Sequence, residues 1–265
     1  MRKGNLIIVG GGMKASKEKI LKAFIDRAGG VPRICVIAAA SIEPLESYES
    51  IKEGFLKVGV KEIDIKLLPL AQIEDSQNYE KFGHEGLLPY LDDVNAVWFT
   101  GGDQLKLTDS LLDENKNDSP VLRKIREILK NGGVIGGTSA GAAIMSENMI
   151  TRGGDKGSLL FPVEYDYSNY EDIFEEDSEL EKMLITNGLG FLKDAIVDQH
   201  FNKRARLQRL MRALEVTNVK KGYGISEDTA MIVTLDTEEY EVLGSGYIME
   251  VDMISKDNYQ IKRKY

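Results

Sequence analysis

Ser139 lies in a stretch of very small residues that reads Gly-Gly-Thr-Ser-Ala-Gly at positions 136–141 and follows an apolar pair at 134–135. The pattern Gly-x-Ser-x-Gly is typical of a sharp strand-to-helix turn that holds a serine hydroxyl out into open space. Small residues on both sides let the strand and the helix pass close together. The segment predicts a serine nucleophile, and the alternative is a plain glycine-rich turn that starts a helix.

A serine nucleophile needs a base, and the chain contains two histidines. His84 falls near the expected start of a helix, where an exposed polar histidine is the ordinary interpretation. His200 ends the run Ala-Ile-Val-Asp-Gln-His at positions 195–200. A buried strand there delivers its imidazole to the carboxyl edge of the sheet, on the side expected for Ser139. His200 is therefore the candidate base, and a structural histidine is the alternative.

Glu227 and Asp228 follow a strand candidate at 222–226 and supply the carboxylate that a charged imidazole requires. Adjacent side chains of a strand point to opposite faces, so only one of the two can take this role. We expect Glu227, with Asp228 as the alternative. The order serine, histidine, acid excludes an α/β-hydrolase, in which the histidine comes last.

Backbone amides beside the serine are expected to hold the oxyanion of an acyl-transfer reaction. One is the amide of Ala140, which directly follows the nucleophile. The other is that of Gly102, in a glycine-rich turn at positions 101–102 that ends a neighbouring strand candidate. A plain tight turn is the alternative at 101–102. This chemistry requires no cofactor. The glycines at 10–12 do not match a dinucleotide-binding loop.

Short apolar runs alternate with amphipathic segments through the first half of the chain. The strand candidates cover residues 6–9, 34–39, 62–67, 96–99 and 134–135, and the helix candidates cover 17–28, 48–57, 78–91 and 120–129. This alternation predicts an α/β fold with a mostly parallel central sheet flanked by helices on both faces. Further strands at 222–226, 231–234, 240–243 and 248–251 are expected to be antiparallel and to close the sheet edge. We expect one domain over residues 1–265.

The composition excludes several classes of function. A formal charge of −9 argues against nonspecific nucleic-acid binding, which needs a basic face. Two histidines and one cysteine, far apart, argue against a His/Cys metal site. Cys35 lies in an apolar run and is expected to be a buried core thiol. Since no apolar run approaches a membrane span and residues 1–9 do not resemble a signal peptide, we expect no membrane association and a cytoplasmic protein.

Arginines gather after His200, at positions 204, 206, 209 and 212 of a segment that we expect to form one helix over 202–212. Four arginines within nine residues form a solvated basic face in many helices. Near the base, however, a guanidinium can clamp a substrate carboxylate with two parallel hydrogen bonds. The sequence leaves these two interpretations open.

Four segments together resemble the cyanophycinase family of serine peptidases. They are Gly-Gly-Thr-Ser-Ala-Gly-Ala-Ala at 136–143, Gly-Gly-Asp-Gln at 101–104, Asp-Gln-His-Phe at 198–201 with the arginines that follow it, and Gly-Ile-Ser-Glu-Asp-Thr-Ala at 224–230. That family is related to dipeptidase E and, in fold, to class I glutamine amidotransferases. The resemblance spans nearly the whole chain.

The resemblance implies that Ser139 attacks, that His200 is the base and that Glu227 orients it. It implies a substrate pocket shaped by six further residues, which are Gln104, Asp198, Gln199, Arg204, Arg206 and Arg209. The implied substrate is cyanophycin, a polyaspartate whose side chains each carry an arginine, which is cleaved to β-aspartyl-arginine dipeptides. The resemblance also implies a homodimer.

Each repeat of that polymer carries a free carboxylate and a guanidinium, so a pocket for it needs both signs of charge. The acidic segment 171–179 can attract guanidinium groups, and a solvated acidic loop is the alternative. Two other functions stay open. One is a serine peptidase of the same fold that acts on other aspartyl or isoaspartyl peptides, and the other is a catalytically silent binding module.

Overall fold

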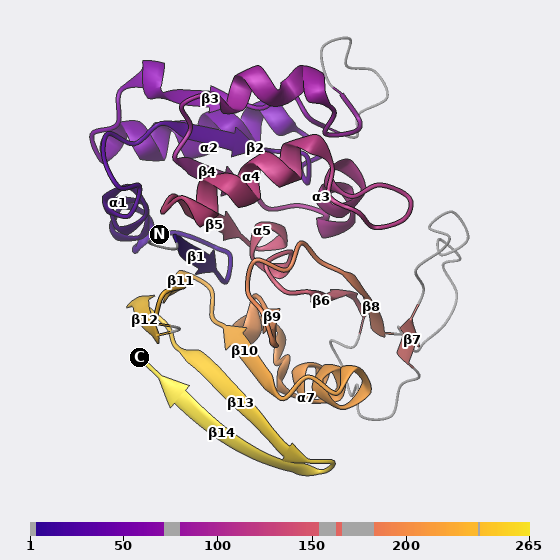
Figure 1. The fold of residues 1–265 in the computed structure, drawn as a ribbon. Coiled ribbons are helices and arrows are strands. Elements are labelled where there is room, and N and C mark those ends of the chain that lie inside the picture. Colours follow the sequence, from indigo (N-terminus) through magenta and orange to yellow (C-terminus); the bar gives the residue numbers. More distant parts are fainter. Residues whose placement is uncertain (1–3, 72–79, 154–162, 166–182, 238) are drawn as a thin grey trace.

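A seven-stranded central sheet dominates the computed structural model, which describes residues 4–71, 80–153, 163–165, 183–237 and 239–265 (Figure 1). The strand order is β12-β11-β1-β5-β4-β2-β3. The strands are β1 (Asn5–Val9), β2 (Ile34–Ile37), β3 (Ile65–Leu67), β4 (Ala96–Phe99), β5 (Val134–Thr138), β11 (Thr229–Thr234) and β12 (Glu239–Gly244). Strands β1 to β5 run parallel to one another, and β11 and β12 are added antiparallel at one edge of the sheet.

Helices cover both faces of this sheet. They are α1 (Lys17–Asp26) and α2 (Pro44–Lys57) on one face, and α3 (Gln104–Leu111) and α4 (Pro120–Lys130) on the other. Successive side chains of β1 point to opposite faces of the sheet. Ile7 therefore packs with α1 and α2, whereas Leu6 and Ile8 pack with α3 and α4. A sheet buried on both faces accounts for the continuous apolar runs of its parallel strands.

Two smaller sheets lie beside the central one. The second sheet, in the order β14-β13-β10-β9, contains β9 (Ala195–Asp198), β10 (Lys221–Ile225), β13 (Ile248–Ser255) and β14 (Asn258–Lys264). The third, in the order β6-β8-β7, contains β6 (Asn148–Arg152), β8 (Met183–Asn187) and β7 (Val163–Tyr165). The remaining elements are the α-helices α5 (Ala140–Ala143), α6 (Phe201–Arg204) and α7 (Leu207–Thr217), and the 3-10 helices η1 (Glu62–Asp64) and η2 (Glu85–Leu91).

The predicted α/β class is confirmed, with a mostly parallel sheet and antiparallel strands near the C-terminus. The expectation that all four late strands close the central sheet is wrong for two of them. β11 and β12 do so, whereas β10 and β13 belong to the second sheet. β10 pairs with β9 and β13 instead, and α6 and α7 pack directly onto its glycines, where a Cβ at Gly222 would lie 2.9 Å from Leu210.

Three helix or strand predictions also need correction. The strand expected at 62–67 begins only at Ile65, after the 3-10 turn η1. The helix expected at 78–91 contains the 3-10 helix η2, and its first two residues lie outside the described part of the chain. The single helix expected at 202–212 is broken by Ala205, which has a left-handed backbone with φ 51°. No helix in the described residues is both long enough and apolar enough to span a bilayer.

Candidate active site

Ser139 occupies the turn between β5 and α5, where its glycine-rich surroundings predict it. Its backbone, with φ 56° and ψ −110°, is a strained conformation for a residue with a side chain. The Ser139 amide donates to the carbonyl of Val9 at 3.0 Å, which ties the turn to β1. A Cβ at Gly137 would lie 2.3 Å from the carbonyl oxygen of Gly141, so only glycine permits this close passage of strand and helix.

Three side chains from distant parts of the chain form a hydrogen-bonded row. Ser139 Oγ lies 2.9 Å from His200 Nε2, and His200 Nδ1 lies 2.7 Å from Glu227 Oε1. The side chains of His200 and Glu227 are 15% and 25% exposed, so the row is largely shielded from water yet reachable. This is the geometry of a nucleophile, a base and the acid that orients the base.

His200 reaches this row from the second sheet and not, as we expected, from a strand of the central sheet. It follows β9, and its own backbone is left-handed, with φ 50°. Its amide donates to the carbonyl of Gly10 at 2.7 Å, at the end of β1. This bond brings the end of β9 to the carboxyl edge of the central sheet, where Ser139 lies.

The glycine turn at 10–12 packs against His200 and Glu227, which the sequence alone did not predict. A Cβ at Gly11 would lie 2.3 Å from His200 Cε1, and one at Gly12 would lie 2.8 Å from Glu227 Oε2. Both glycines have positive φ, 96° and 57°. The backbone of this turn therefore packs directly against the imidazole and the carboxylate. The sequence signal was three glycines that directly follow a strand.

Glu227 and Asp228 take different roles. Asp228 points away from His200 and accepts hydrogen bonds from the amides of Lys14 and Ser16, at 2.7 and 3.0 Å, and from the Ser245 hydroxyl at 2.8 Å. Burial opposes ionisation of Asp228, but these donors outweigh it and hold its pKa below the ordinary value of 3.8. Asp228 thus fixes the loop that leads into α1, and Glu227 alone contacts the imidazole.

The environment keeps the imidazole neutral and the carboxylate ionised. Burial lowers the pKa of His200 below its ordinary value of 6.5; the hydrogen bond with Glu227 opposes this, and the charges of Arg204 and Arg206 add to it. The hydrogen bond with His200 lowers the pKa of Glu227. At neutral pH a proton on Nδ1 satisfies Glu227 and leaves Nε2 free to accept from Ser139.

Two backbone amides beside Ser139 are available to a ligand. In the described part of the chain, neither Gly102 nor Ala140 donates its amide to another residue. Ala140 begins α5, where the first amides of a helix have no partner within the helix. The turn that holds Gly102 is close to Ser139, because a Cβ at Gly101 would lie 3.3 Å from the Cβ of Ser139.

Comparison with known proteins matches residues 6–240 to peptidase family S51. The chain is 34% identical over 262 residues to the cyanophycinase of Synechococcus elongatus, an alignment that covers 97% of this chain and 71% of that protein. It is 35% identical over 257 residues to the cyanophycinase of Geminocystis herdmanii, with coverages of 95% and 81%. The chain belongs to peptidase family S51. This is a family of serine peptidases, so the chain is a serine peptidase.

A solved structure, that of a peptidase from an acI-B1 actinobacterium, has the same fold as this S51 peptidase. The TM-score is 0.64 at 19% sequence identity, and the match covers 98% of this chain and 94% of the other. Likeness at this identity concerns the fold alone.

The arginines of this S51 peptidase that follow His200 divide into two groups. Arg204 is exposed, whereas Arg206 and Arg209 are 3% and 2% exposed. Arg209 holds Asp198 with two hydrogen bonds, of 2.9 Å from Nε and 2.5 Å from Nη2. Arg206 donates to the carbonyl and side-chain oxygens of Gln199, at 2.8 and 2.7 Å. For Arg206 and Arg209 a solvated basic face is therefore the wrong interpretation.

Gln104 and Arg209 hold the same segment of the S51 fold. Gln104 is buried at the start of α3 and donates to the carbonyls of Ile150 and Thr151 at the end of β6. Arg209 donates to the carbonyl of Gly153 at 2.9 Å. Five of the six residues assigned to a substrate pocket are thus buried and tied to their neighbours, and these are Gln104, Asp198, Gln199, Arg206 and Arg209. The acidic segment 171–179 lies outside the described residues.

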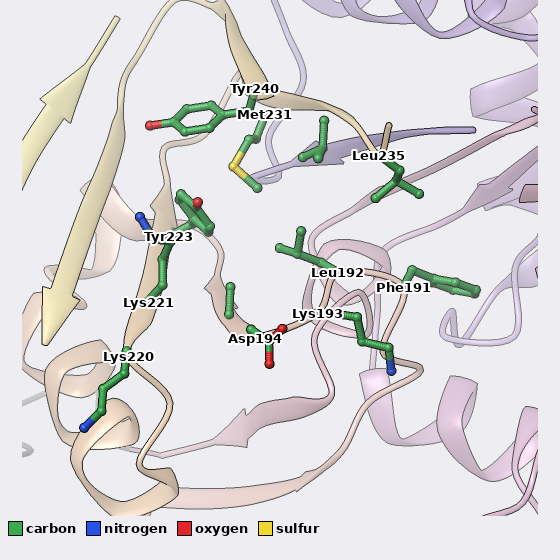
Figure 2. A pocket seen from close by; sticks show the side chains of 12 residues that line it. Phe191, Leu192, Lys193, Asp194, Lys220, Lys221, Tyr223, Met231, Leu235 and Tyr240 are labelled. Atoms are coloured by element: carbon green, nitrogen blue, oxygen red, sulfur yellow. The ribbon is translucent and has the colours of Figure 1, made fainter. Parts of the chain in front are cut away.

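A cavity of about 650 Å³ opens at the amino-terminal ends of β9 and β10 (Figure 2). Tyr223, Tyr240 and Met231 line it, and the two tyrosine rings meet edge to face with centroids 5.4 Å apart. None of its lining residues belongs to the hydrogen-bonded row at Ser139. This cavity is therefore separate from the candidate active site of the S51 peptidase.

The other titratable residues noted in the sequence have structural explanations. Cys35 is buried in the core, and burial raises the pKa of its thiol to about 12, so it is not a nucleophile. His84 is exposed and accepts a hydrogen bond from the Gly86 amide at the start of η2. In the part of the chain that the structure describes, no group of three His, Cys, Asp or Glu side chains is arranged to hold a metal ion.

Proposed function

We propose that this serine peptidase degrades cyanophycin and that Ser139 is its nucleophile. The observation that carries the proposal is the row Ser139, His200 and Glu227, with contacts of 2.9 and 2.7 Å, beside two free amides. A binding module that had lost catalysis would have no reason to keep a strained serine within hydrogen-bond distance of a neutral imidazole. The substrate assignment is supported by the likeness to cyanophycinases over nearly the whole chain.

The reaction proceeds in two steps through an acyl-enzyme. Ser139 Oγ attacks the carbonyl carbon of the scissile bond, and its proton passes to His200 Nε2. The oxyanion accepts hydrogen bonds from the amides of Gly102 and Ala140. His200 then gives its proton to the leaving amine, and a water molecule activated by His200 releases the acyl group. The product is a β-aspartyl-arginine dipeptide, and no cofactor takes part.

The residues that follow His200 serve the substrate in two ways in this proposal. Arg204, which is exposed and close enough to influence the imidazole, contacts a substrate carboxylate. Gln104 and Arg209 shape the pocket by holding the end of β6 in place, and Asp198 holds Arg209. Gln199 and Arg206 form a second buried pair that shapes the pocket. We also propose a homodimer in the cytoplasm, which rests on the family likeness alone.

Substrate identity is tested by a direct comparison of purified cyanophycin with short isoaspartyl dipeptides. We expect release of β-aspartyl-arginine from the polymer, detected by mass spectrometry, and a kcat/KM at least about tenfold higher for the polymer, since several repeats contact the enzyme at once. Faster hydrolysis of the dipeptides, with no product from the polymer, would replace cyanophycin by other aspartyl peptides as the substrate.

The pH dependence of the reaction tests the role of His200. Only the neutral imidazole accepts a proton, and the pKa of His200 is below 6.5, so kcat/KM will be constant at neutral pH and fall as the pH drops through that lower pKa. Arg204→Gln removes a positive charge that lowers this pKa, so the inflection will move to higher pH. The exposed Arg123→Gln, on α4, is the matched control and will leave the inflection in place. An inflection above 6.5 in the unmodified enzyme would contradict the assignment.

A further inference from the structure

A cavity of about 470 Å³ is lined by residues of α1, of α2, of the end of β4 and of the turn that holds Ser139. Trp98 and Thr100 line it from the sheet, and Ser47 lines it from α2. Its volume is in the range of pockets that bind small molecules. None of the residues at 198–209 lines it, so it is distinct from the pocket that the family resemblance implies.

Two buried polar groups on the sheet side of this cavity have no partner. Thr100 Oγ1 and Trp98 Nε1 form no hydrogen bond, although their residues are only 5% and 0% exposed. The two residues are two positions apart at the end of β4, so their side chains emerge on the same face of the sheet. Buried donors without a partner are costly, and in native proteins they are rare outside functional sites. The indole N–H can only donate, so a ligand group here must be an acceptor.

Lys17 adds a positive charge to the cavity wall. It is partly buried, and its ammonium donates to the carbonyl of Ser50 at 3.0 Å, which leaves two of its three N–H bonds unused. It forms no ion pair with any carboxylate of the described residues. Burial and the charge of Lys57 lower its pKa, and the charge of Glu53 opposes this shift. An ammonium in this position is suited to a carboxylate ligand.

Glu46 adds a negative charge at the rim. It lies in the first turn of α2, lines the cavity and is exposed. Its carboxyl group interacts with Glu43, which raises the pKa of Glu46, and no cation of the described residues pairs with it. Lys17 and Glu46 therefore line one cavity without forming an ion pair with each other.

We propose that this cavity is a second substrate subsite that takes a zwitterionic branch, with its carboxylate between Lys17 and Thr100 and its cation at Glu46. The inference rests on the proposed function, because an arginine joined through its amino group to the polymer has a free carboxylate and a guanidinium. Donors line the wall of the cavity and a carboxylate lies at its rim, so the polarity of the subsite matches the branch. Lys17, Thr100 and Glu46 are thus specificity-determining residues.

The test uses three synthetic oligomers of β-aspartyl-arginine. One carries arginine, one carries citrulline, which replaces the guanidinium by a neutral group of similar shape, and one carries arginine amide, which removes the branch carboxylate. We expect the unmodified enzyme to have a kcat/KM about tenfold or more higher for the arginine oligomer than for each of the others, because each analogue loses a hydrogen bond that involves a charged group. Glu46→Gln will lower the ratio of kcat/KM for the arginine oligomer to that for the citrulline oligomer at least about fivefold. Lys17→Met and Thr100→Val will lower the ratio of the arginine oligomer to the arginine amide oligomer by a similar factor.

Matched controls and outcomes separate this inference from the proposed function. Glu49→Gln on α2 and Lys19→Met on α1 remove the same charges from residues outside the cavity and will leave both preferences unchanged. If the enzyme cleaves the arginine oligomer but the cavity variants keep the unmodified preferences, the subsite is wrong and the proposed function stands. If no oligomer is cleaved, the proposed function fails. Calorimetry then measures the binding of the same oligomers to the Ser139→Ala protein and to Ser139→Ala proteins that also carry Glu46→Gln or Lys17→Met. Equal affinities of these proteins for the arginine oligomer overturn the subsite.

Discussion

Replacing Ser139 by alanine will lower kcat for peptide hydrolysis by about four to six orders of magnitude, the range known for loss of a nucleophile that acts with a histidine and an acid. The substitution keeps Cβ and therefore the backbone of the elbow, with φ 56°. Only the 2.9 Å contact to His200 is lost, so the free energy of unfolding will change by less than about 1 kcal/mol. Turnover of the polymer and urea unfolding of the same preparation measure the two effects.

The control is Ser146→Ala, at a buried serine in a structural role. Its hydroxyl accepts from the Val197 amide at 2.7 Å and is fully buried, so its loss will reduce stability by about 1 to 3 kcal/mol and leave kcat within a few fold. A Ser139→Ala enzyme that retains a tenth of the activity would refute Ser139 as the nucleophile.

Replacing Arg209 by methionine will reduce the free energy of unfolding by about 3 to 5 kcal/mol, the largest effect on stability that we expect from a single substitution here. Asp198 is 1% exposed, and Arg209 supplies its two shortest hydrogen bonds. The change leaves a buried carboxylate with Arg206 at 3.6 Å as its nearest remaining cation. Methionine retains much of the volume of the arginine stem, so the loss of unfolding free energy comes mainly from removal of the guanidinium charge beside Asp198.

Arg212→Met, one turn further along α7, is the control. Arg212 is partly exposed and pairs with Glu215 at 3.1 Å, so its loss will cost less than about 1 kcal/mol. Adding Asp198→Asn to Arg209→Met will restore stability relative to the single variant, because it removes the unpaired carboxylate. Urea unfolding checks all four proteins, and equal losses for Arg209→Met and Arg212→Met would contradict a buried charge pair.

The local patterns were sufficient to predict the turn that holds Ser139 and to single out the histidine that lies beside it. Small residues around Ser139 are required by the close passage of β5 and α5, and this steric demand is visible in a single segment. His200 followed from elimination, since one of only two histidines lay at the end of an apolar run. The alternating strands and helices of the first half predicted the parallel sheet for the same reason, because each depends on short-range spacing.

The features that were missed depend on partners far away in the chain. β10 joins the second sheet because it pairs with β9 and β13, and these pairings are not visible in its own segment of the sequence. Arg209 was indistinguishable from a solvated arginine until Asp198 was placed beside it. The break at Ala205 has no local signal, because alanine favours a helix. The cavity with Lys17 and Glu46 combines α1, α2 and β4, and no segment of the sequence contains more than one of its charges.

The origin of the three aligned side chains has a mechanical consequence. The hydroxyl is fixed to the seven-stranded sheet, the imidazole follows a strand of the neighbouring four-stranded sheet, and the carboxylate lies where the chain crosses between the two. A slide of one sheet past the other by a single ångström would separate the proton donor from its acceptor without melting any helix or strand. The rate of turnover is thus more sensitive to the relative position of the two sheets than any spectroscopic signal of secondary structure.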